Sequence, residues 1–247
     1  MRTFIAGDVH GNIDVLEGLL LEAGVIYYDE AEVCHRAPDI YTIHVGDLID
    51  GTSRRASGDR MCLQAAPYWF DTVLVGNHEW PYLGGAQFHG FHAEADIEDI
   101  IHDWADREYL VPAYLVDDTI LVTHAGVTQE KQYADAEEAY EKIVDRWNMR
   151  PLDDSLFQAV AAIRDGSDPF GGIFWADHSE KKNGKFNQVF GHTPMSEPDV
   201  KLSEGVYHVN IDNGGKGGAR CAGVFIEDGL FLDVVTYVRP PSEDIFD

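Results

Sequence analysis

Short apolar runs that lead into glycine and polar side chains recur along this chain, and they constrain its fold more than any other feature. Five runs have the length of a buried strand and end in, or just before, such a cluster: Thr3–Gly7, Ile40–Gly46, Thr72–Gly76, Thr119–His124 and Gln188–Gly191. In α/β sheets the ligand crevice lies outside the carboxyl ends of the strands. We therefore expect the polar residues that follow these runs to share one site.

Stretches with helical periodicity alternate with the early strands. Apolar residues recur about every 3.6 residues over Ile97–Trp104 and Ala136–Trp147, and a shorter helix is expected after the first strand, beginning near Ile13. Late in the chain, strands Val206–Ile211, Ala222–Glu227 and Leu230–Tyr237 follow one another, the last two joined across a hairpin-type Asp-Gly turn. This order predicts a layered α/β fold whose C-terminal part is antiparallel.

The 247 residues contain no repeat, linker or low-complexity stretch, so we expect a single domain over residues 1–247. With 45% hydrophobic residues the chain can bury a substantial core. Cys34, Cys62 and Cys221 are too widely spaced to indicate a disulfide framework or a thiolate zinc site. No signal-peptide core and no apolar run of membrane-spanning length is present. A cytoplasmic protein with no membrane partner is expected.

The charge is strongly acidic, because 44 Asp and Glu residues against 18 Lys and Arg residues give a net charge of −26. Such a field repels long nucleic acids and anionic membranes but says little about small nucleotides. Adaptation to a salty cytoplasm and an ordinary acidic surface both remain open as explanations. Much of the acid lies in Glu94–Glu108 and Glu130–Glu141, which we interpret as solvated helix faces.

The clusters after the five strands offer oxygen and imidazole ligands without sulfur. They read Gly7-Asp8-Val9-His10-Gly11, Gly46-Asp47-Leu48-Ile49-Asp50, Gly76-Asn77-His78-Glu79, Thr123-His124-Ala125-Gly126 and Gly191-His192-Thr193. The candidate metal ligands are Asp8, His10, Asp47, Asn77, His124 and His192. This mixed set favours Mn²⁺, with Fe or Zn²⁺ as alternatives, over Ca²⁺. Since six ligands exceed the needs of one tetrahedral ion, we expect two divalent ions that share a carboxylate.

Two ions about 3.5–4 Å apart can clamp a phosphoryl oxygen and lower the pKa of a water molecule held between them. Cleavage of a phosphate ester then needs an acid for the leaving group. His78 directly follows Asn77, and we interpret it as that acid. Asp50 is expected to hold the His78 imidazole in the right tautomer and to keep it protonated.

The order and spacing of these clusters, over roughly residues 3–193, resemble the phosphoprotein phosphatases of bacterial and phage type, within the calcineurin-like metallophosphoesterases. The signatures of that family are GDxHG, GDxxDRG and GNHE, then His-Gly or His-Ala-Gly and a final Gly-His. Phe174-Trp175-Ala176-Asp177 and Val209-Asn210-Ile211-Asp212 are similar to two later family segments. The resemblance implies a sandwich of two β-sheets flanked by helices.

The resemblance also implies a role for each ligand. One ion would be held by Asp8, His10 and Asp47, and the other by Asp47 as the bridge with Asn77, His124 and His192. A bridging hydroxide would attack phosphorus in line without a phospho-enzyme. His78, with Asp50 behind it, would protonate the departing oxygen.

The chain departs from the family pattern after Asp50, where Gly51-Thr52 stands in place of the arginine that grips the substrate phosphate. Arg54 or Arg55 is a candidate to supply this charge from the same loop. Arg164, ahead of Trp175, is the candidate for a second family arginine.

Two glycine-containing segments remain. Gly84–His92 is either a lid over the site or a long turn, and Asp212–Gly218 is expected to be a wide turn rather than a phosphate-binding P-loop, because no Lys-Ser/Thr follows it.

The function that follows is metal-dependent hydrolysis of phosphate esters, serine/threonine-phosphatase-like, on a phosphorylated protein or a small phosphate ester. One alternative is a hydrolase of dinucleoside polyphosphates of the diadenosine tetraphosphate type, and another is a small-nucleotide phosphodiesterase. A more distant alternative is an inactive phosphatase-like binding protein.

Overall fold

Strands and helices alternate through the first half of the chain. The computed structural model describes residues 1–128, 132–149, 152–180, 184–203 and 205–241. The first elements are β1 (Arg2–Ala6), α1 (Ile13–Glu22), β2 (Ile26–Tyr28), β3 (Cys34–Arg36), β4 (Ile40–His44), α2 (Ala56–Trp69), β5 (Thr72–Leu74), the 3₁₀ turn η1 (Trp80–Leu83), α3 (Ala95–Asp106), β6 (Leu110–Val111), β7 (Ala113–Val116) and β8 (Ile120–Thr123).

The second half adds two helices, several 3₁₀ turns and the remaining strands. These elements are α4 (Ala136–Asn148), α5 (Ser155–Gln158), η3 (Ala162–Arg164), η4 (His178–Glu180), β9 (Asn187–Phe190), β10 (Asp199–Ser203), β11 (Val206–Asn210), η5 (Gly215–Gly217), β12 (Arg220–Glu227) and β13 (Leu230–Val238).

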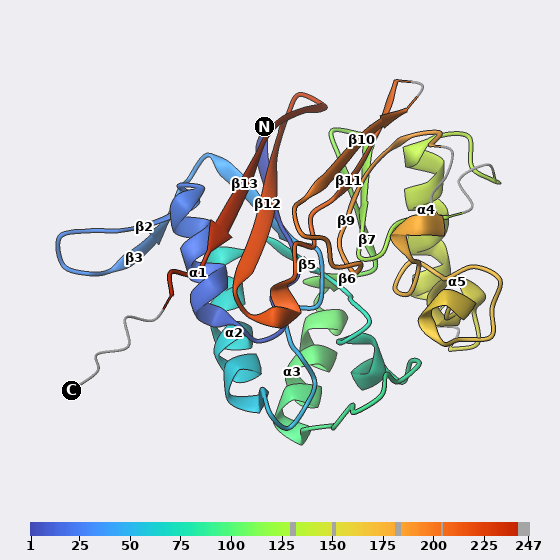
Figure 1. Ribbon diagram of the computed structural model, residues 1–247, viewed down its shortest axis with the longest axis horizontal. Helices are drawn as coiled ribbons and strands as arrows, with labels where there is room; N and C mark the ends of the chain where they lie inside the picture. Colours follow the sequence, from blue (N-terminus) through green and yellow to red (C-terminus); the bar gives the residue numbers. More distant parts are fainter. Residues whose placement is uncertain (129–131, 150–151, 181–183, 204, 242–247) are drawn as a thin grey trace.

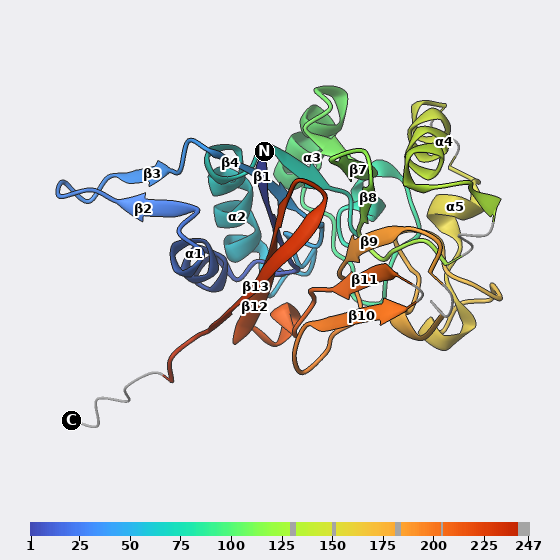
Figure 2. The ribbon, with the colours of Figure 1, turned by 90° about the horizontal axis from the view of Figure 1, so that it is seen from above.

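Two sheets lie face to face and form the centre of the molecule (Figure 1). The six-stranded sheet has the order β13-β12-β1-β4-β5-β6, and the five-stranded sheet has the order β10-β11-β9-β8-β7. In the first sheet β1, β4, β5 and β6 are parallel, and in the second β8, β9 and β11 are parallel. A separate hairpin of β2 and β3 extends outward beside α1 (Figure 2).

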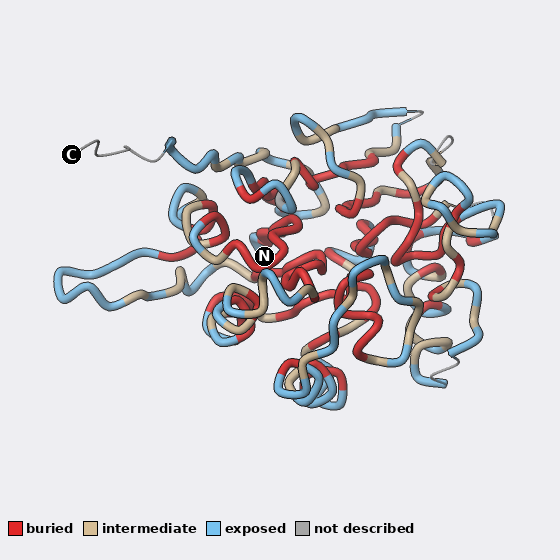
Figure 3. The backbone as a smooth tube through the Cα atoms, turned by 60° about the horizontal axis from the view of Figure 1, so that its bottom comes forward, coloured by how far each residue is buried: buried red, intermediate tan, exposed pale blue. Residues whose placement is uncertain are grey.

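Alternating side chains divide the core into two layers. In β1, Ile5 points into the cluster between the two sheets, whereas its neighbours Phe4 and Ala6 point into the cluster beneath the helices. The same alternation places Val122 of β8 between the sheets and Leu121 toward the helix layer. Buried backbone therefore concentrates where the sheets meet, and exposed backbone lies at the periphery (Figure 3).

Helices cover the outer faces of the sandwich, with α1, α2 and α3 beside the first sheet and α4 beside the second (Figure 2). Helix α3 buries Ile97, Ile101 and Trp104, and its acidic side chains are exposed, as the periodicity predicted. Helix α4 begins at a true cap, since the Asp135 carboxylate accepts a hydrogen bond from the Glu138 backbone N–H at 2.9 Å. Its buried face packs against β7 and β8. Glu130, where the second acidic stretch was expected to start, lies outside the described residues.

The layered α/β fold with two flanked sheets is confirmed. The expectation of an antiparallel C-terminal part holds for the β12–β13 hairpin across Asp228-Gly229 and for β10–β11, whereas the other neighbour of β11, β9, is parallel to it. Helix α2 was not predicted, because Ser57-Gly58 and Pro67 interrupt its apolar spacing. The described residues contain no helix long and apolar enough to cross a membrane.

Candidate functional site

Five strands position the residues of the candidate site, and all of them end at the same edge of the sandwich. Asp8 and His10 follow β1, Asp47 follows β4, and Asn77 and His78 follow β5. From the second sheet, His124 follows β8 and His192 follows β9. Because β1, β4 and β5 are parallel to one another, as are β8 and β9, their carboxyl ends converge. All of these side chains are buried.

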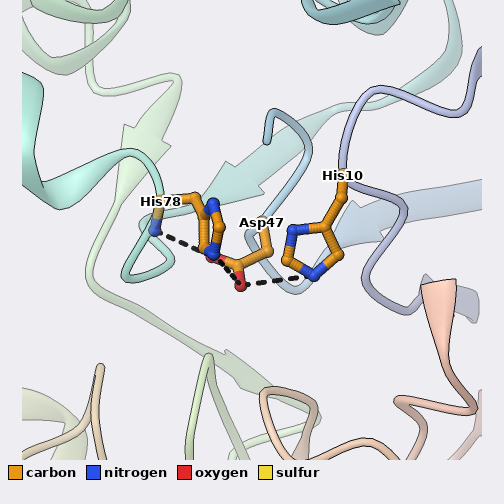
Figure 4. A group of neighbouring side chains, drawn as sticks. All are labelled: His10, Asp47 and His78. Carbon is orange, nitrogen blue, oxygen red and sulfur yellow. Dashed lines mark hydrogen bonds and ion pairs between the residues drawn. The ribbon is translucent and has the colours of Figure 1, made fainter. Parts of the chain in front are cut away.

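The Asp47 carboxylate is the centre of the site. Its Oδ2 lies 3.7 Å from His10 Nε2 and 3.9 Å from His78 Nε2, so the two imidazoles flank it (Figure 4). Its Oδ1 faces the other way and lies 3.5 Å from His124 Nε2. The two oxygens of one carboxylate thus address two separate groups of nitrogen ligands, as a bridging ligand must.

A second convergence joins Asn77, His124 and His192. Asn77 Oδ1 lies 3.1 Å from His124 Nε2 and 2.7 Å from His192 Nδ1, and the two ring nitrogens are 3.2 Å apart. His124 Nδ1 donates to the Val45 carbonyl at 3.1 Å, so in the neutral ring Nε2 is left as an acceptor. Acceptor atoms that converge in this way are typical of ligands around a cation.

Asp8 connects the two sheets at the site. Its Oδ2 accepts a hydrogen bond from the His192 backbone N–H at 3.0 Å. A Cβ at Gly191 would overlap Asp8 Oδ1, so that position requires glycine. Asp8 Oδ1 and His10 Nδ1 are buried and have no hydrogen-bond partner among the described residues. Buried polar atoms of this kind fit a metal centre, since a buried polar atom without a partner is otherwise costly.

Three of the candidate ligands have left-handed backbone conformations. The φ angles of His10, Asp47 and His192 are +48°, +53° and +69°. Non-glycine residues rarely adopt this region, and when they do so together they mark a functional site that holds the strain in place. The strained backbone turns each side chain from the strand end into the shared centre.

The electrostatics of the site favour a bound cation. Burial raises the pKa of Asp8 well above its usual value, and the neighbouring carboxylates Asp212 and Asp47 raise it further. Burial also raises the pKa of Asp47, with Glu79 adding to it, and lowers the pKa of His10. Carboxylates that resist ionisation and imidazoles that resist protonation both become better ligands once a divalent ion supplies positive charge.

His78 lies beside Asp47 but differs in one respect from the sequence-based interpretation. Its Nδ1–H donates to the main-chain carbonyl of Asp50 at 2.6 Å, whereas the Asp50 carboxylate accepts a hydrogen bond from Thr52. The expected carboxylate contact is therefore replaced by a carbonyl contact, which still sets the tautomer. Burial lowers the pKa of His78 to about 3, and the positive charge of Lys216 lowers it further.

The three candidate arginines occupy different surroundings. Arg54 is exposed, and Arg55 at the start of α2 donates to the Asn12 side chain, next to the β1 loop. Arg164 lies 2.9 Å from Asp177 through Nε, and its Nη2 donates to Thr193 Oγ1 at 2.6 Å, one residue beyond His192. Arg55 and Arg164 thus border the ligand loops. Arg54 makes no hydrogen bond or ion pair with these loops among the described residues.

Two buried acidic residues that hold the ligand loops were not singled out from the sequence. Glu79 accepts hydrogen bonds from the backbone N–H groups of Asp47 and Gly76 at 2.9 Å, and burial raises its pKa to about 7. Asp59 of α2 accepts from the N–H groups of Asp50 and Gly51 at 2.8 and 3.0 Å. Glu79 closes the Gly-Asn-His-Glu motif and was visible there, whereas Asp59 lies in the helix that the sequence did not reveal.

Two further residues reach the site from the two glycine-containing segments, one predicted as either a lid or a long turn and the other as a wide turn. Phe88 stacks on His78 with ring centroids 4.0 Å apart and an interplanar angle of 28°, so the Gly84–His92 segment does cover part of the site. Lys216, from η5, places its Nζ 3.5 Å from His78 Nε2. The sequence signal for both was weak, since each lies among glycines without a motif of its own.

Comparison with known proteins agrees with this arrangement. The family model of the calcineurin-like phosphoesterases matches residues 1–217. No curated protein sequence matches the chain significantly.

Several solved structures are similar in fold. A cold-active protein-tyrosine phosphatase from a psychrophilic Shewanella species is 18% identical, with a TM-score of 0.58 over 93% of this chain and 76% of that chain. A Saccharomyces cerevisiae protein serine/threonine phosphatase, described as similar to human phosphatase PP5, is 16% identical, with a TM-score of 0.55 over 99% and 82% of the two chains. A provisionally assigned diadenosine tetraphosphatase is 16% identical, with a TM-score of 0.51 over 95% and 93%.

At these sequence identities the solved structures establish only a shared fold. The assignment to a family rests on the match to the family model together with the motifs. The ligand-bearing motifs lie at one edge of the two-sheet sandwich, within the matched residues. The chain belongs to the calcineurin-like phosphoesterases.

Proposed function

We propose that the protein is a metal-dependent phosphomonoesterase, serine/threonine-phosphatase-like, that uses two divalent ions on either side of Asp47. The observation that carries this proposal is the orientation of the Asp47 carboxylate. Its Oδ2 faces His10 and its Oδ1 faces His124, at 3.7 and 3.5 Å. A carboxylate with both oxygens turned to separate imidazoles is suited to join two ions.

The side chains present fit such a pair of ions. Asp8, His10 and Asp47 would hold one ion, and Asp47, Asn77, His124 and His192 would hold the other. When bound there, Mn²⁺, or alternatively Fe or Zn²⁺, supplies Lewis-acid activation of a phosphoryl oxygen and of a water molecule.

His78 is proposed as the proton donor to the leaving oxygen. Its neutral ring presents Nε2 toward the centre, because Nδ1–H is held by the Asp50 carbonyl at 2.6 Å. A phosphate dianion that binds beside Nε2 favours the imidazolium form, since a nearby negative charge raises the pKa of histidine. The proton taken up at Nε2 is then in position to pass to the departing alkoxide or phenoxide.

The substrate is proposed to be a phosphorylated protein or a small phosphate ester. The names of two structures similar in fold, a protein-tyrosine phosphatase and a protein serine/threonine phosphatase, support this class. The net charge of −26 disfavours long polyanions but permits a compact phosphate group. A dinucleoside polyphosphate is the competing substrate to include in the assay.

The test measures metal content and turnover together. Chelator-treated protein would be reloaded with Mn²⁺, and bound Mn²⁺ per chain and hydrolysis of an aryl phosphate would be measured for the native chain, for Asp47→Asn and for Asp233→Asn. Asp233 is exposed on β13, so its variant is a matched control. We expect two ions per native chain. Asp47→Asn should lower metal affinity and turnover by more than about 100-fold. Loss of a residue that only hydrogen-bonds to a metal ligand typically costs about 10- to 100-fold, and loss of a ligand should cost more.

Circular dichroism would establish that both variants are folded. Unchanged metal content and unchanged turnover in folded Asp47→Asn would contradict the bridging role. Cleavage of diadenosine tetraphosphate in strong preference to the monoester would replace the proposed substrate class with the competing one.

A further inference from the structure

Glycine stands directly after Asp50, where family members carry an arginine, and its surroundings disfavour a side chain there. Gly51 has a φ of +62°, which disfavours residues with a Cβ. A Cβ there would lie 3.2 Å from Phe88 Cζ and 3.5 Å from Phe91 Cδ2. Two aromatic rings of the Gly84–His92 segment thus border this position, and since glycine itself offers no charge, a cation for the phosphate has to come from another residue.

Lys216 approaches the same space from the opposite segment, between β11 and β12. Its Nζ lies 3.5 Å from His78 Nε2 and 5.7 Å from the centroid of the Phe88 ring. His78 Nε2 is in turn 3.9 Å from Asp47 Oδ2. A side chain 138 positions along the chain from His78 therefore places a positive charge at the face of the site where the leaving group and phosphate must lie.

The other cations near the site are already engaged. Arg164 is paired with Asp177 and bonded to Thr193, and Arg55 donates to Asn12. Among the described residues, by contrast, Lys216 forms no ion pair with a carboxylate. Its ammonium group is therefore available to an incoming anion without breaking an existing pair.

We propose that Lys216 binds the substrate phosphate and takes the place of the arginine that the family carries directly after Asp50. This inference rests on the proposed function. Its physical basis is charge: the site is lined by Asp8, Asp47 and Asp212, and a phosphate dianion approaching them gains from a cation on its outer side.

The Lys216 ammonium group and the His78 imidazole border the same space, since Nζ lies 3.5 Å from Nε2. Lysine supplies a point charge where arginine would supply a planar fork, so the grip is expected to be less directional than in the family pattern.

The experiment compares Lys216→Met, Lys216→Arg and a matched control, Lys142→Met, which removes an exposed lysine of α4. For Mn²⁺-loaded protein, binding of inorganic phosphate would be measured by calorimetry, and KM and kcat would be measured for an aryl phosphate. We expect Lys216→Met to weaken phosphate binding and raise KM by about 10- to 100-fold, the range for loss of a charged hydrogen bond. Metal content and kcat should change much less, Lys216→Arg should restore most of the affinity, and Lys142→Met should match the native chain.

The outcomes separate this inference from the function beneath it. If the native chain hydrolyses the ester with Mn²⁺ but Lys216→Met binds phosphate as tightly, the role of Lys216 is overturned while the proposed function stands. A drop in kcat with unchanged phosphate affinity would also overturn it, because Lys216 would then act on His78 rather than on phosphate. If the Mn²⁺-loaded native chain neither binds phosphate nor hydrolyses the ester, both proposals fail together.

Discussion

The loops that carry the ligands and the segments that cover them are built in opposite ways. The ligand loops, at residues 7–12, 46–51, 76–79, 124–126 and 191–193, are buried almost throughout, and three of their non-glycine residues have left-handed backbone. The covering segments, at residues 84–92 and 212–218, are rich in glycine and include Gly90 and Gly214, where an added Cβ would meet nothing within 4 Å.

This difference suggests that the two regions serve different tasks, catalysis in the ligand loops and substrate choice in the covering segments. Glu79 and Asp59 each bind two or more backbone N–H groups of the ligand loops, so the main chain there has little freedom to change. The covering segments supply Phe88 and Lys216, which touch the site only through their side chains. Under the proposed function, we expect the ligand loops to determine the chemistry and the covering segments to determine which substrates are preferred.

His78 lies where the ligand loops and the covering segments meet, so its substitution is the strongest test of the difference between them. His78→Asn should lower kcat for an alkyl phosphate by about 10²- to 10⁴-fold, the range for loss of a general acid, with metal content unchanged. The effect should shrink for an aryl phosphate with a good leaving group, because that oxygen needs no proton. Rates would be measured across a series of leaving groups. An equal loss for every leaving group would mean that His78 acts in binding or metal ligation rather than as the acid.

A pH titration of stability sharpens the view that buried carboxylates hold the ligand loops. Burial raises the pKa of Asp59 to about 6 from its usual 3.8, so the folded state binds this proton more tightly than the unfolded state does. The contribution to stability is full below about pH 4 and is lost as the pH rises through about 6, by about 3 kcal/mol in total. Denaturant unfolding of metal-free protein from pH 4 to 7 would measure it. Asp59→Asn should remove this part of the slope, and a slope identical to that of the native chain would refute the assignment.

The smallest effect is expected in the covering segments. Gly90 has a φ of +89° and open space around it, so Gly90→Ala should cost only the backbone strain of a left-handed residue, about 1–2 kcal/mol. The kinetic constants should remain within about two-fold of the native values. Unfolding midpoints and steady-state kinetics would be compared directly. A large loss of turnover would show that this segment is as constrained as the ligand loops, so the two regions would not differ in their tolerance to substitution.

The predictability of the molecule from its sequence follows the same division. Asp47, Asn77 and His124 could be placed because each directly follows an apolar strand, so local pattern and site position coincide. The contact between Asp50 and His78 was predicted through the wrong group. His78 bonds to the main-chain carbonyl of Asp50, and every residue has such a carbonyl, so the sequence does not single it out.

Long-range contacts could not be predicted from the sequence for a different reason. Gly58 and Pro67 interrupt the helical pattern of α2, so neither this helix nor the contact of its Asp59 with the Asp50 loop was predicted. Lys216 meets His78 only because two sheets bring distant strand ends together, and no spacing within either segment encodes that meeting.

The surroundings of Gly51 also limit how the protein could be re-engineered. An arginine introduced there would have to accommodate both a left-handed backbone and the rings of Phe88 and Phe91. Gly51→Arg alone is therefore expected to be unfavourable, and smaller side chains at positions 88 and 91 would have to accompany it. A designer who wants a stronger positive charge at this site would accordingly start from position 216 rather than from position 51.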